Sequence, residues 1–249
     1  GVDRNPECFG PLLCDAFCAK PDVDESEPAY IQFWERLLVE ESVDLVLPGI
    51  EEDMFFLAAH HEVLSERTVL GLNTPALIDL ARDKWRLAEV AGGMTIPATL
   101  SWNWDECVAE LGPAPLLLKP RRGSGSRGIV RLENETDFEY WAGRAGTDFM
   151  VQKIVGTDEQ EFTVGLFGLG EGRVVPPPIL LRRRLSSAGN TQYAEVVNDD
   201  ALTEAVQGLA KQLKPVGPTN FQFRKDEDRI YLLEINPRFS SSSSLRSAF

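Results

Sequence analysis

The spacing of hydrophobic residues divides the first third of the chain into alternating helices and strands. Apolar residues recur at helical spacing over residues 29–41, and the short apolar, β-branched run 43–47 follows. Helical spacing returns over 51–65, and residues 68–70 indicate another strand. This alternation predicts a layered α/β unit, which we interpret as a truncated doubly wound domain.

A different order of elements is expected further along the chain. A helix over about 75–90 ends at two glycines and at Pro97, where we place a boundary. Beyond it, apolar runs separated by turn residues predict strands at 115–118, 149–155, 161–167, 174–181, 219–223 and 230–235, with helices at 135–145 and 199–213. Strands and helices in this mixed order indicate an α+β fold rather than a parallel sheet.

The composition restricts the possible binding partners more than it restricts the possible folds. The 249 residues are 43% hydrophobic, enough for a sizeable core, and the formal net charge of −14 disfavours nucleic acid and anionic membrane surfaces. We expect a cytoplasmic protein, since the chain has no run of about 20 apolar residues and no signal-peptide pattern at its start. Both ends look cut, so that a first strand and a closing helix are expected to be missing.

A glycine-rich loop follows the strand at 115–118. Lys119 ends the strand, and residues 123–128 hold three glycines and two serines. Such a backbone is mobile, its N–H groups can surround phosphate oxygens, and the lysine adds a positive charge for the same anion. The loop is not a Walker A motif, and a flexible surface hairpin explains it equally well.

A hairpin near the carboxy end carries a polar face. Alternation puts the apolar Phe221, Phe223, Tyr231, Leu233 and Ile235 on one side and the polar Gln222, Glu234 and Asn236 on the other. A turn that pairs residue 225 with 229 would set 222 opposite 232 and 220 opposite 234. One carboxylate and two amide oxygens suit Mg²⁺, although a merely solvated hairpin face is the alternative.

Arg238 follows the hairpin directly. Pro237 stiffens the exit from the strand, and the guanidinium can grip an anion near the polar cluster with two hydrogen bonds. An ordinary surface arginine is the alternative.

The order of these segments resembles the ATP-grasp superfamily, most closely its carbamoyl phosphate synthetase large-subunit-like branch. The segments are Asp83-Lys84, KPRRGSGSRGI at 119–129, VQKIVG at 151–156, EQEFTV at 159–164, and FQF with EINPR at 221–238, followed by a serine-rich stretch. The resemblance covers about 84–249, and 1–83 more loosely. It implies a partial pre-ATP-grasp Rossmann-like domain at 1–82 and an ATP-grasp domain of two α+β lobes at 83–249, with a small lobe at about 97–155 and a large lobe at about 156–249.

The resemblance also implies a nucleotide site between the lobes. Lys84 and Lys119 would contact phosphates, beneath a flap formed by Gly123, Ser124, Gly125, Ser126 and Gly128. Adenine would be read by the hinge Gln152, Lys153, Ile154 and Val155, although family members often have glutamate where Lys153 stands. Glu159 or Glu161 would bind ribose, and we favour Glu159.

Gln222, Glu234 and Asn236 match the magnesium ligands of the family, and Arg238 matches its phosphate-stabilising arginine. The cofactors implied are ATP and Mg²⁺, with Mn²⁺ as an alternative. Arg182, Arg183 and Arg184 form a basic patch, of which we expect Arg184 to meet the acyl substrate or the γ-phosphate.

The implied function is a carboxylate-amine ligase that forms an acylphosphate and couples it to an amine, with amino acids as candidate substrates. A carboxylating or carbamoyl-phosphate-forming enzyme would share every ATP contact, and a non-catalytic nucleotide-binding module is the alternative from another class. Similar proteins are commonly homodimers.

Overall fold

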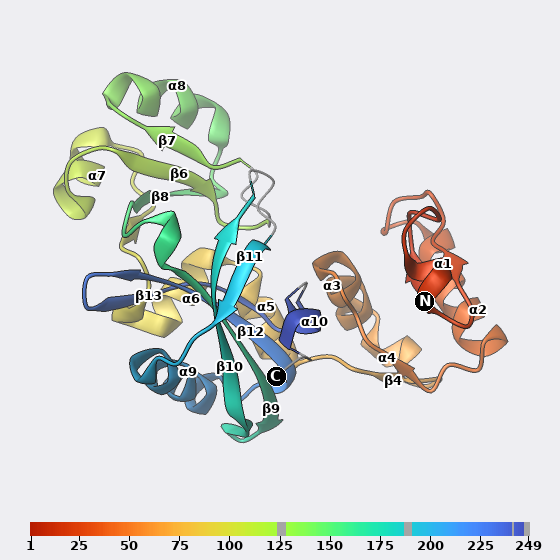
Figure 1. Ribbon diagram of the computed structural model, residues 1–249. Coiled ribbons are helices and arrows are strands. Elements are labelled where there is room, and N and C mark those ends of the chain that lie inside the picture. Colours follow the sequence, from red (N-terminus) through yellow and green to blue (C-terminus); the bar gives the residue numbers. More distant parts are fainter. Residues whose placement is uncertain (124–127, 187–190, 241, 247–249) are drawn as a thin grey trace. The chain divides into compact units, whose positions relative to one another are not determined.

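The computed structural model describes residues 1–123, 128–186, 191–240 and 242–246 (Figure 1). The chain divides into two compact units, residues 1–48 with 52–71 and residues 49–51 with 72–249. Within the described residues, every helix is too short or too polar to cross a membrane.

The first unit alternates helices and short parallel strand pairs. Its elements are β1 (Val2–Asp3), α1 (Gly10–Leu13), β2 (Cys18–Ala19), α2 (Pro28–Glu40), β3 (Leu45–Val46), α3 (Glu51–Ala59), α4 (His61–Leu64) and β4 (Val69–Leu70), with β1 pairing β2 and β3 pairing β4. The predicted helix over 51–65 is two helices instead. A buried ion pair joins Lys20 Nζ to Asp53 Oδ1 at 2.5 Å and thereby ties β2's end to α3.

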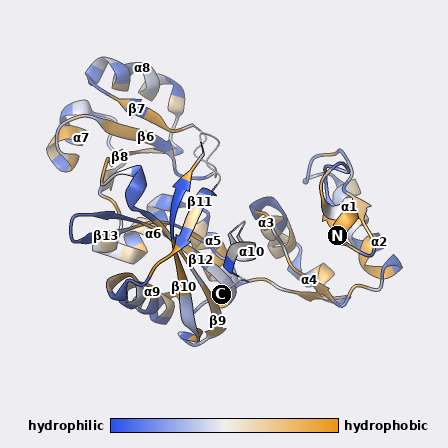
Figure 2. Ribbon diagram, viewed as in Figure 1, coloured by the Kyte–Doolittle hydropathy of each residue, from blue (hydrophilic) through white to orange (hydrophobic). Residues whose placement is uncertain are grey.

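The small lobe of the second unit is a four-stranded antiparallel sheet with two helices. The strand order is β5 (Ala98–Thr99), β8 (Phe149–Lys153), β6 (Leu116–Pro120), β7 (Val130–Leu132), and the helices are α7 (Trp104–Leu111) and α8 (Glu135–Ala145). Asn103 and Asn134 cap these helices by accepting backbone N–H bonds. The apolar colouring of β6 and β7 in Figure 2 marks the core, which α7 and α8 cover with Cys107 and Phe138.

The large lobe is a five-stranded antiparallel sheet. Its strand order is β11 (Thr191–Val196), β10 (Arg173–Leu185), β9 (Glu161–Gly170), β12 (Val216–Asp226), β13 (Arg229–Asn236), and the remaining elements are η2 (Asp158–Gln160), α9 (Asp200–Leu213) and α10 (Ser243–Arg246). One face carries the main core, in which Val164 and Phe221 pack against Val206 and Leu209 of α9. The opposite face carries polar side chains, as alternation along β9 and β12 requires. The prediction of an α+β fold rather than a parallel sheet is confirmed, because these strands pair in antiparallel fashion.

The helix predicted over 75–90 is wrong as a single element. The structure has α5 (Pro75–Ala81) and α6 (Lys84–Ala91), followed by η1 (Gly92–Met94). Asp83 separates them because its carboxylate accepts the backbone N–H groups of Trp85 and Arg86 and so starts a new helix. The same carboxylate receives Nη2 of Arg121 at 2.6 Å, which fixes the start of α6 to the end of β6.

The register predicted for the carboxy-terminal hairpin is also wrong. Asp226 pairs with Arg229 across a tighter turn, and a bulge lies between Gln222 and Phe223, so that Gln222 faces Glu234. The bulge adds one residue to β13. The side chains of β13 that precede the bulge therefore point to the side of the sheet opposite to the one predicted. Leu232 therefore packs in the main core. Tyr231 and Leu233, which were expected in that core, lie on the opposite side of the sheet.

Candidate functional site

A cavity of ≈ 640 Å³ lies between the small-lobe sheet and the polar face of the large-lobe sheet. We call it the interlobe cavity and define it by the polar residues that line it: Lys84, Lys119, Gln152, Asp158, Glu159, Glu161, Arg183, Arg184, Ser186, Gln222, Arg224 and Glu234. Apolar side chains, including Ile96, Leu117 and Leu233, complete its wall. Mixed lining of this kind suits a ligand with a flat apolar part and a charged part.

Lys119 is the most strongly perturbed cation in this cavity. The side chain ends β6, is only 8% exposed, and donates from Nζ to Gln152 Oε1 at 2.8 Å. Burial and, to a lesser extent, the nearby charge of Lys84 lower the pKa of Lys119 to about 8, while the charge of Glu234 opposes the shift. The hydrogen-bond partner of this buried ammonium is a neutral amide, so an anion that enters the cavity would stabilise the charged form of Lys119.

Lys84 brings a second cation to the same place. As the first residue of α6 it donates from its backbone N–H to Arg121 O at 2.9 Å and from Nζ to Gly123 O at 2.6 Å. These bonds place the lysine beside the entry of the glycine-rich loop. Gly123 has φ +115°, a conformation that a side-chain-bearing residue rarely adopts.

Glu161 forms ion pairs with two arginines, Arg183 and Arg224. Its carboxylate is 4% exposed, accepts from Arg183 Nη2 at 2.7 Å through Oε1, and from Arg224 Nη2 at 2.7 Å through Oε2. Arg183 also donates to Gln222 Oε1, so the network crosses β10, β9 and β12. Because both carboxylate oxygens are engaged by cations, Glu161 acts as a fixed counter-ion in this structure.

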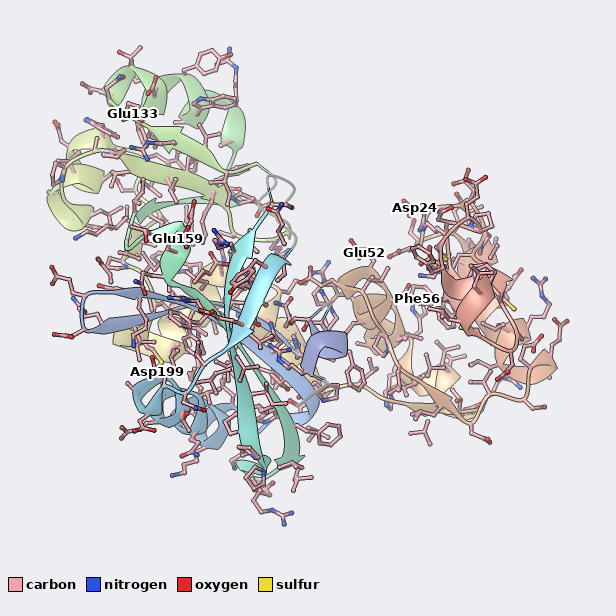
Figure 3. All side chains as sticks on the ribbon, viewed as in Figure 1. Asp24, Glu52, Phe56, Glu133, Glu159 and Asp199 are labelled. Atoms are coloured by element: carbon pink, nitrogen blue, oxygen red, sulfur yellow. The ribbon has the colours of Figure 1, made fainter. Side chains whose placement is uncertain are left out.

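Glu159 lies differently although it is only two residues away. It belongs to η2 and is labelled in Figure 3. Its side chain is 70% exposed, and its Oε1 lies 3.9 Å from Nη1 of Arg184, which also lines the cavity. Arg184 also lies over the Tyr193 ring, with 4.8 Å between guanidinium carbon and ring centroid. The exposed carboxylate of Glu159 can accept hydrogen bonds from the hydroxyl groups of a ligand. Glu161 is less able to do so, because both of its oxygens already accept from arginines.

The predicted metal ligands form a contiguous group on the hairpin. Gln222 faces Glu234 across the strands and both line the cavity, while Asn236 is buried and donates from Nδ2 to Glu234 Oε1 at 3.1 Å. In the described part of the chain, no three His, Cys, Asp or Glu side chains gather as a metal site. A divalent ion here therefore requires the amide oxygens as well, and one carboxylate with two amides fits the oxygen preference of Mg²⁺.

Several sequence-predicted residues lie elsewhere. Arg238 lines a different cavity, and the described residues Gly128, Lys153, Ile154 and Val155 are absent from the interlobe lining. Val155 is buried with Ile96 and Tyr231, so it supports the wall from behind. Ser124, Gly125 and Ser126 lie outside the described residues.

Sequence reasoning missed two basic contributions to the site. Arg224 lies two residues after Gln222 on β12 and shares its face, a signal that strand alternation offered. Arg183 was preferred less than Arg184, yet it is the one that is buried and bound to Gln222 and Glu161. Arg182 points away and pairs with Glu195 on β11.

Comparison with known proteins identifies this architecture. Residues 147–245 match a family model described as an ATP-grasp in the biosynthetic pathway with the Ter operon. The biotin carboxylase domain of Hydrogenobacter thermophilus 2-oxoglutarate carboxylase, solved with MgADP, ADP and bicarbonate, aligns with a TM-score of 0.75 at 20% identity. That alignment covers 98% of this chain and 59% of the other. The chain has an ATP-grasp fold, and its residues 147–245 resemble an ATP-grasp family.

Further relatives extend this assignment. N5-carboxyaminoimidazole synthetase from Staphylococcus aureus, complexed with ADP, aligns to 99% of this ATP-grasp chain and 65% of its own, with a TM-score of 0.72 and 19% identity. The carbamoyl phosphate synthase large chain of Thermoplasma acidophilum is 24% identical over 256 residues, covering 89% of this chain and 23% of its own length.

An uncharacterized protein, y4rH of Sinorhizobium fredii, is 28% identical over 174 residues, which cover 61% of this ATP-grasp chain. The chain spans 34% of the length of that relative and less than two thirds of either solved structure described above.

Proposed function

We propose that this ATP-grasp chain binds Mg-ATP in the interlobe cavity and uses it to activate a carboxylate for coupling to an amine. The observation that carries the proposal is the presence of two cations, Lys84 and buried Lys119, at the same cavity as Gln222 and Glu234. Asn236, which donates to Glu234, lies behind this pair and completes the oxygen cluster. Cations for a polyphosphate and hard oxygen ligands for Mg²⁺ are the two requirements of a metal-nucleotide site.

Each residue type has a distinct task in this proposal. Lys119 and Lys84 hold phosphate oxygens, and Glu234 with the two amides would hold Mg²⁺, which would neutralise part of the phosphate charge. The apolar wall formed by Ile96, Leu117 and Leu233 accepts a base, and exposed Glu159 accepts ribose hydroxyls.

Positioning and charge neutralisation are the contribution of the protein to phosphoryl transfer. A carboxylate oxygen of the acyl substrate attacks the γ-phosphorus while the bond to the β-phosphate oxygen breaks, which yields an acylphosphate and ADP. Arg183 is held rigidly by Glu161 and Gln222, so its charge is already oriented when negative charge redistributes. The amine then displaces phosphate from the acyl carbon and loses its proton.

A second candidate is carboxylation, in which bicarbonate takes the place of the acyl substrate. It is favoured by the solved biotin carboxylase domain, whose complex contains bicarbonate together with MgADP. Every nucleotide contact described above would be unchanged, so only the acceptor separates the two candidates.

An assay with hydroxylamine separates these candidates. Hydroxylamine converts an acylphosphate of an organic acid into a stable hydroxamate, whereas activated bicarbonate gives no such product. We expect ADP release that depends on an organic carboxylate and is accompanied by hydroxamate. Release driven by bicarbonate alone would favour carboxylation, and nucleotide binding without release in any combination would leave a binding module.

Matched variants link the activity to the site. Glu234→Gln and Lys119→Met are expected to lower ADP release by at least about 100-fold, since each removes a charge that the phosphates or the metal require. Glu204→Gln and Lys211→Met, at exposed positions of α9, repeat the same changes outside the cavity and should leave the rate near wild type.

A further inference from the structure

A second cavity, of ≈ 320 Å³, opens on the polar face of the large-lobe sheet. Its wall is mainly apolar and includes Phe167, Val175 and Ile179, while two arginines, Arg238 and Arg246, line it as well. We call it the arginine cavity. An apolar chamber with cationic groups at its lining is a shape for a molecule with an apolar body and an anionic group.

Arg246 is held in place by neutral groups alone. The residue is 9% exposed and donates from Nη2 to Thr163 Oγ1 at 3.0 Å and Asn220 Oδ1 at 2.8 Å, and from Nη1 to Ser240 Oγ at 3.2 Å. Arg238 donates from Nη1 to the backbone oxygens of Gly49 and Phe239. Within the described part of the chain, both arginines have a buried Nε with no hydrogen-bond partner. In a protein of net charge −14, two arginines bound to neutral groups at one cavity are a conspicuous arrangement.

The backbone beneath Arg246 is adapted to its position. Gly165 of β9 has no side chain there, and a Cβ at this residue would lie 2.7 Å from the guanidinium carbon. Burial lowers the pKa of Arg246 to about 10, and the charge of Arg183 contributes to the shift. A bound anion would compensate the unfavourable burial of this charge.

The arginine cavity is close to the interlobe cavity along the same strands. Thr163 and Asn220 accept hydrogen bonds from Arg246. Thr163 lies two residues after Glu161 on β9, and Asn220 lies two residues before Gln222 on β12. Two residues of a strand span roughly 7 Å, and residues two apart share a face. An anionic group beside Arg246 would therefore lie on the same face of the sheet as Gln222, roughly 7 Å along the strand from the proposed metal ligands.

We propose that the arginine cavity binds the acyl substrate, a small organic acid whose carboxylate meets Arg246 and Arg238 and whose apolar body lies against Phe167, Val175 and Ile179. This inference rests on the proposed ligase function and names its substrate class. Bicarbonate and inorganic phosphate share the anionic chemistry but have no apolar body, so the wall of the cavity favours an organic acid over either of them.

Direct binding measurements with the full chain test this assignment without requiring turnover. Acetate, butyrate and hexanoate are titrated in the presence of a non-hydrolysable ATP analogue and Mg²⁺, with hexanamide, bicarbonate and phosphate as comparison probes. Affinity is expected to rise by about threefold for each added methylene, because each buries further apolar surface. Hexanamide, bicarbonate and phosphate are expected to bind at least about 10-fold more weakly than hexanoate.

Two pairs of variants assign the binding to named residues. Arg246→Gln keeps much of the side-chain volume and should weaken hexanoate by about 10- to 100-fold, whereas Arg229→Gln, at the exposed end of the hairpin, should not. Phe167→Glu places a negative charge in the wall, and Leu169→Glu repeats the change two residues along the same strand outside the cavity. Only Phe167→Glu should reduce hexanoate binding.

The results separate failure of this inference from failure of the proposed function. Nucleotide binding that stays at wild-type strength in Arg246→Gln and Phe167→Glu shows that both variants are folded. A flat series from acetate to hexanoate, phosphate binding as tight as that of hexanoate, or unchanged hexanoate affinity in Arg246→Gln would overturn the arginine cavity as an acyl site. Absence of nucleotide binding in the wild-type chain would instead overturn the proposed function.

Discussion

Replacement of Lys119 by methionine should stabilise the fold while it abolishes nucleotide binding. Lys119 is buried and its hydrogen-bond partner is the neutral Gln152 side chain. Its pKa is lowered to about 8 from 10.5, chiefly by burial. That difference corresponds to roughly 3 kcal/mol of unfavourable folding free energy at pH 7, at about 1.4 kcal/mol per pKa unit.

The net gain in Lys119→Met is smaller than this figure. Loss of the bond to Gln152 offsets about 1 kcal/mol, so the variant should exceed wild type by about 2 kcal/mol at pH 7. Methionine has a similar length and fills the same apolar space, so no large cavity is expected.

The sign of the pH dependence follows from the direction of the shift. Between the folded pKa near 8 and the unfolded value of 10.5, the unfolded chain binds more protons, so the stability of the wild type rises with pH in this window. The advantage of Lys119→Met should therefore shrink by roughly 2.5 kcal/mol between pH 7 and pH 10. Comparison with the variant cancels the titration of other groups, which both chains share.

Urea unfolding followed by circular dichroism at pH 7 and pH 10 measures this difference. Lys211→Met, at an exposed position of α9, is the matched control and should change the unfolding midpoint little at either pH. A variant that is less stable than wild type at pH 7, or a stability difference that does not change with pH, would refute the argument that burial of a charge at Lys119 is unfavourable in the ligand-free protein.

Three further substitutions test the local geometry. Glu161→Gln leaves the buried Arg183 and Arg224 without their shared counter-ion and should lower the free energy of unfolding by about 3–5 kcal/mol, measured by urea unfolding. Gly165→Ala places a Cβ against Arg246 and should cost about 1–3 kcal/mol, whereas Gly208→Ala, in open space on α9, should stabilise by up to about 1 kcal/mol; equal effects in thermal unfolding would contradict the close approach. Asp83→Ala removes the α6 cap and the Arg121 ion pair and should cost about 1–3 kcal/mol, with faster amide exchange at Trp85 and Arg86; unchanged exchange there would argue against the cap.

Apolar periodicity was sufficient to predict the framework of the second unit. The six predicted strands and both predicted helices of the lobes occur, because each buries a continuous apolar face. Short elements such as β7 and α7 were missed, because a periodic pattern of apolar residues cannot be recognised reliably over only three to eight residues.

The errors occurred where a side chain overrode the local pattern. Asp83 interrupts an otherwise periodic segment because its carboxylate caps a helix and binds Arg121, a residue 38 positions away. The bulge beside Gln222 is likewise set by pairing across the sheet and by the turn at Asp226, so alternation alone gave the wrong face for Tyr231 and Leu233.

The site was partly accessible from sequence. Strand alternation brought Gln222 and Glu234 together, and the resemblance supplied Lys84 and Lys119. The roles of Arg183 and Arg246 depend on which of several basic residues becomes buried, and burial is decided by packing between segments distant in sequence.

Calorimetric titration with a non-hydrolysable ATP analogue measures whether the interlobe cavity binds a magnesium-nucleotide complex. We expect the wild-type chain to bind the analogue at least about 10-fold more tightly with Mg²⁺ than with EDTA. Glu234→Gln should lose this difference, because the Glu234 carboxylate is the one charged ligand in the proposed metal set. Equal affinity with and without Mg²⁺ in the wild type, or a Mg²⁺ effect that is undiminished in Glu234→Gln, would contradict this prediction.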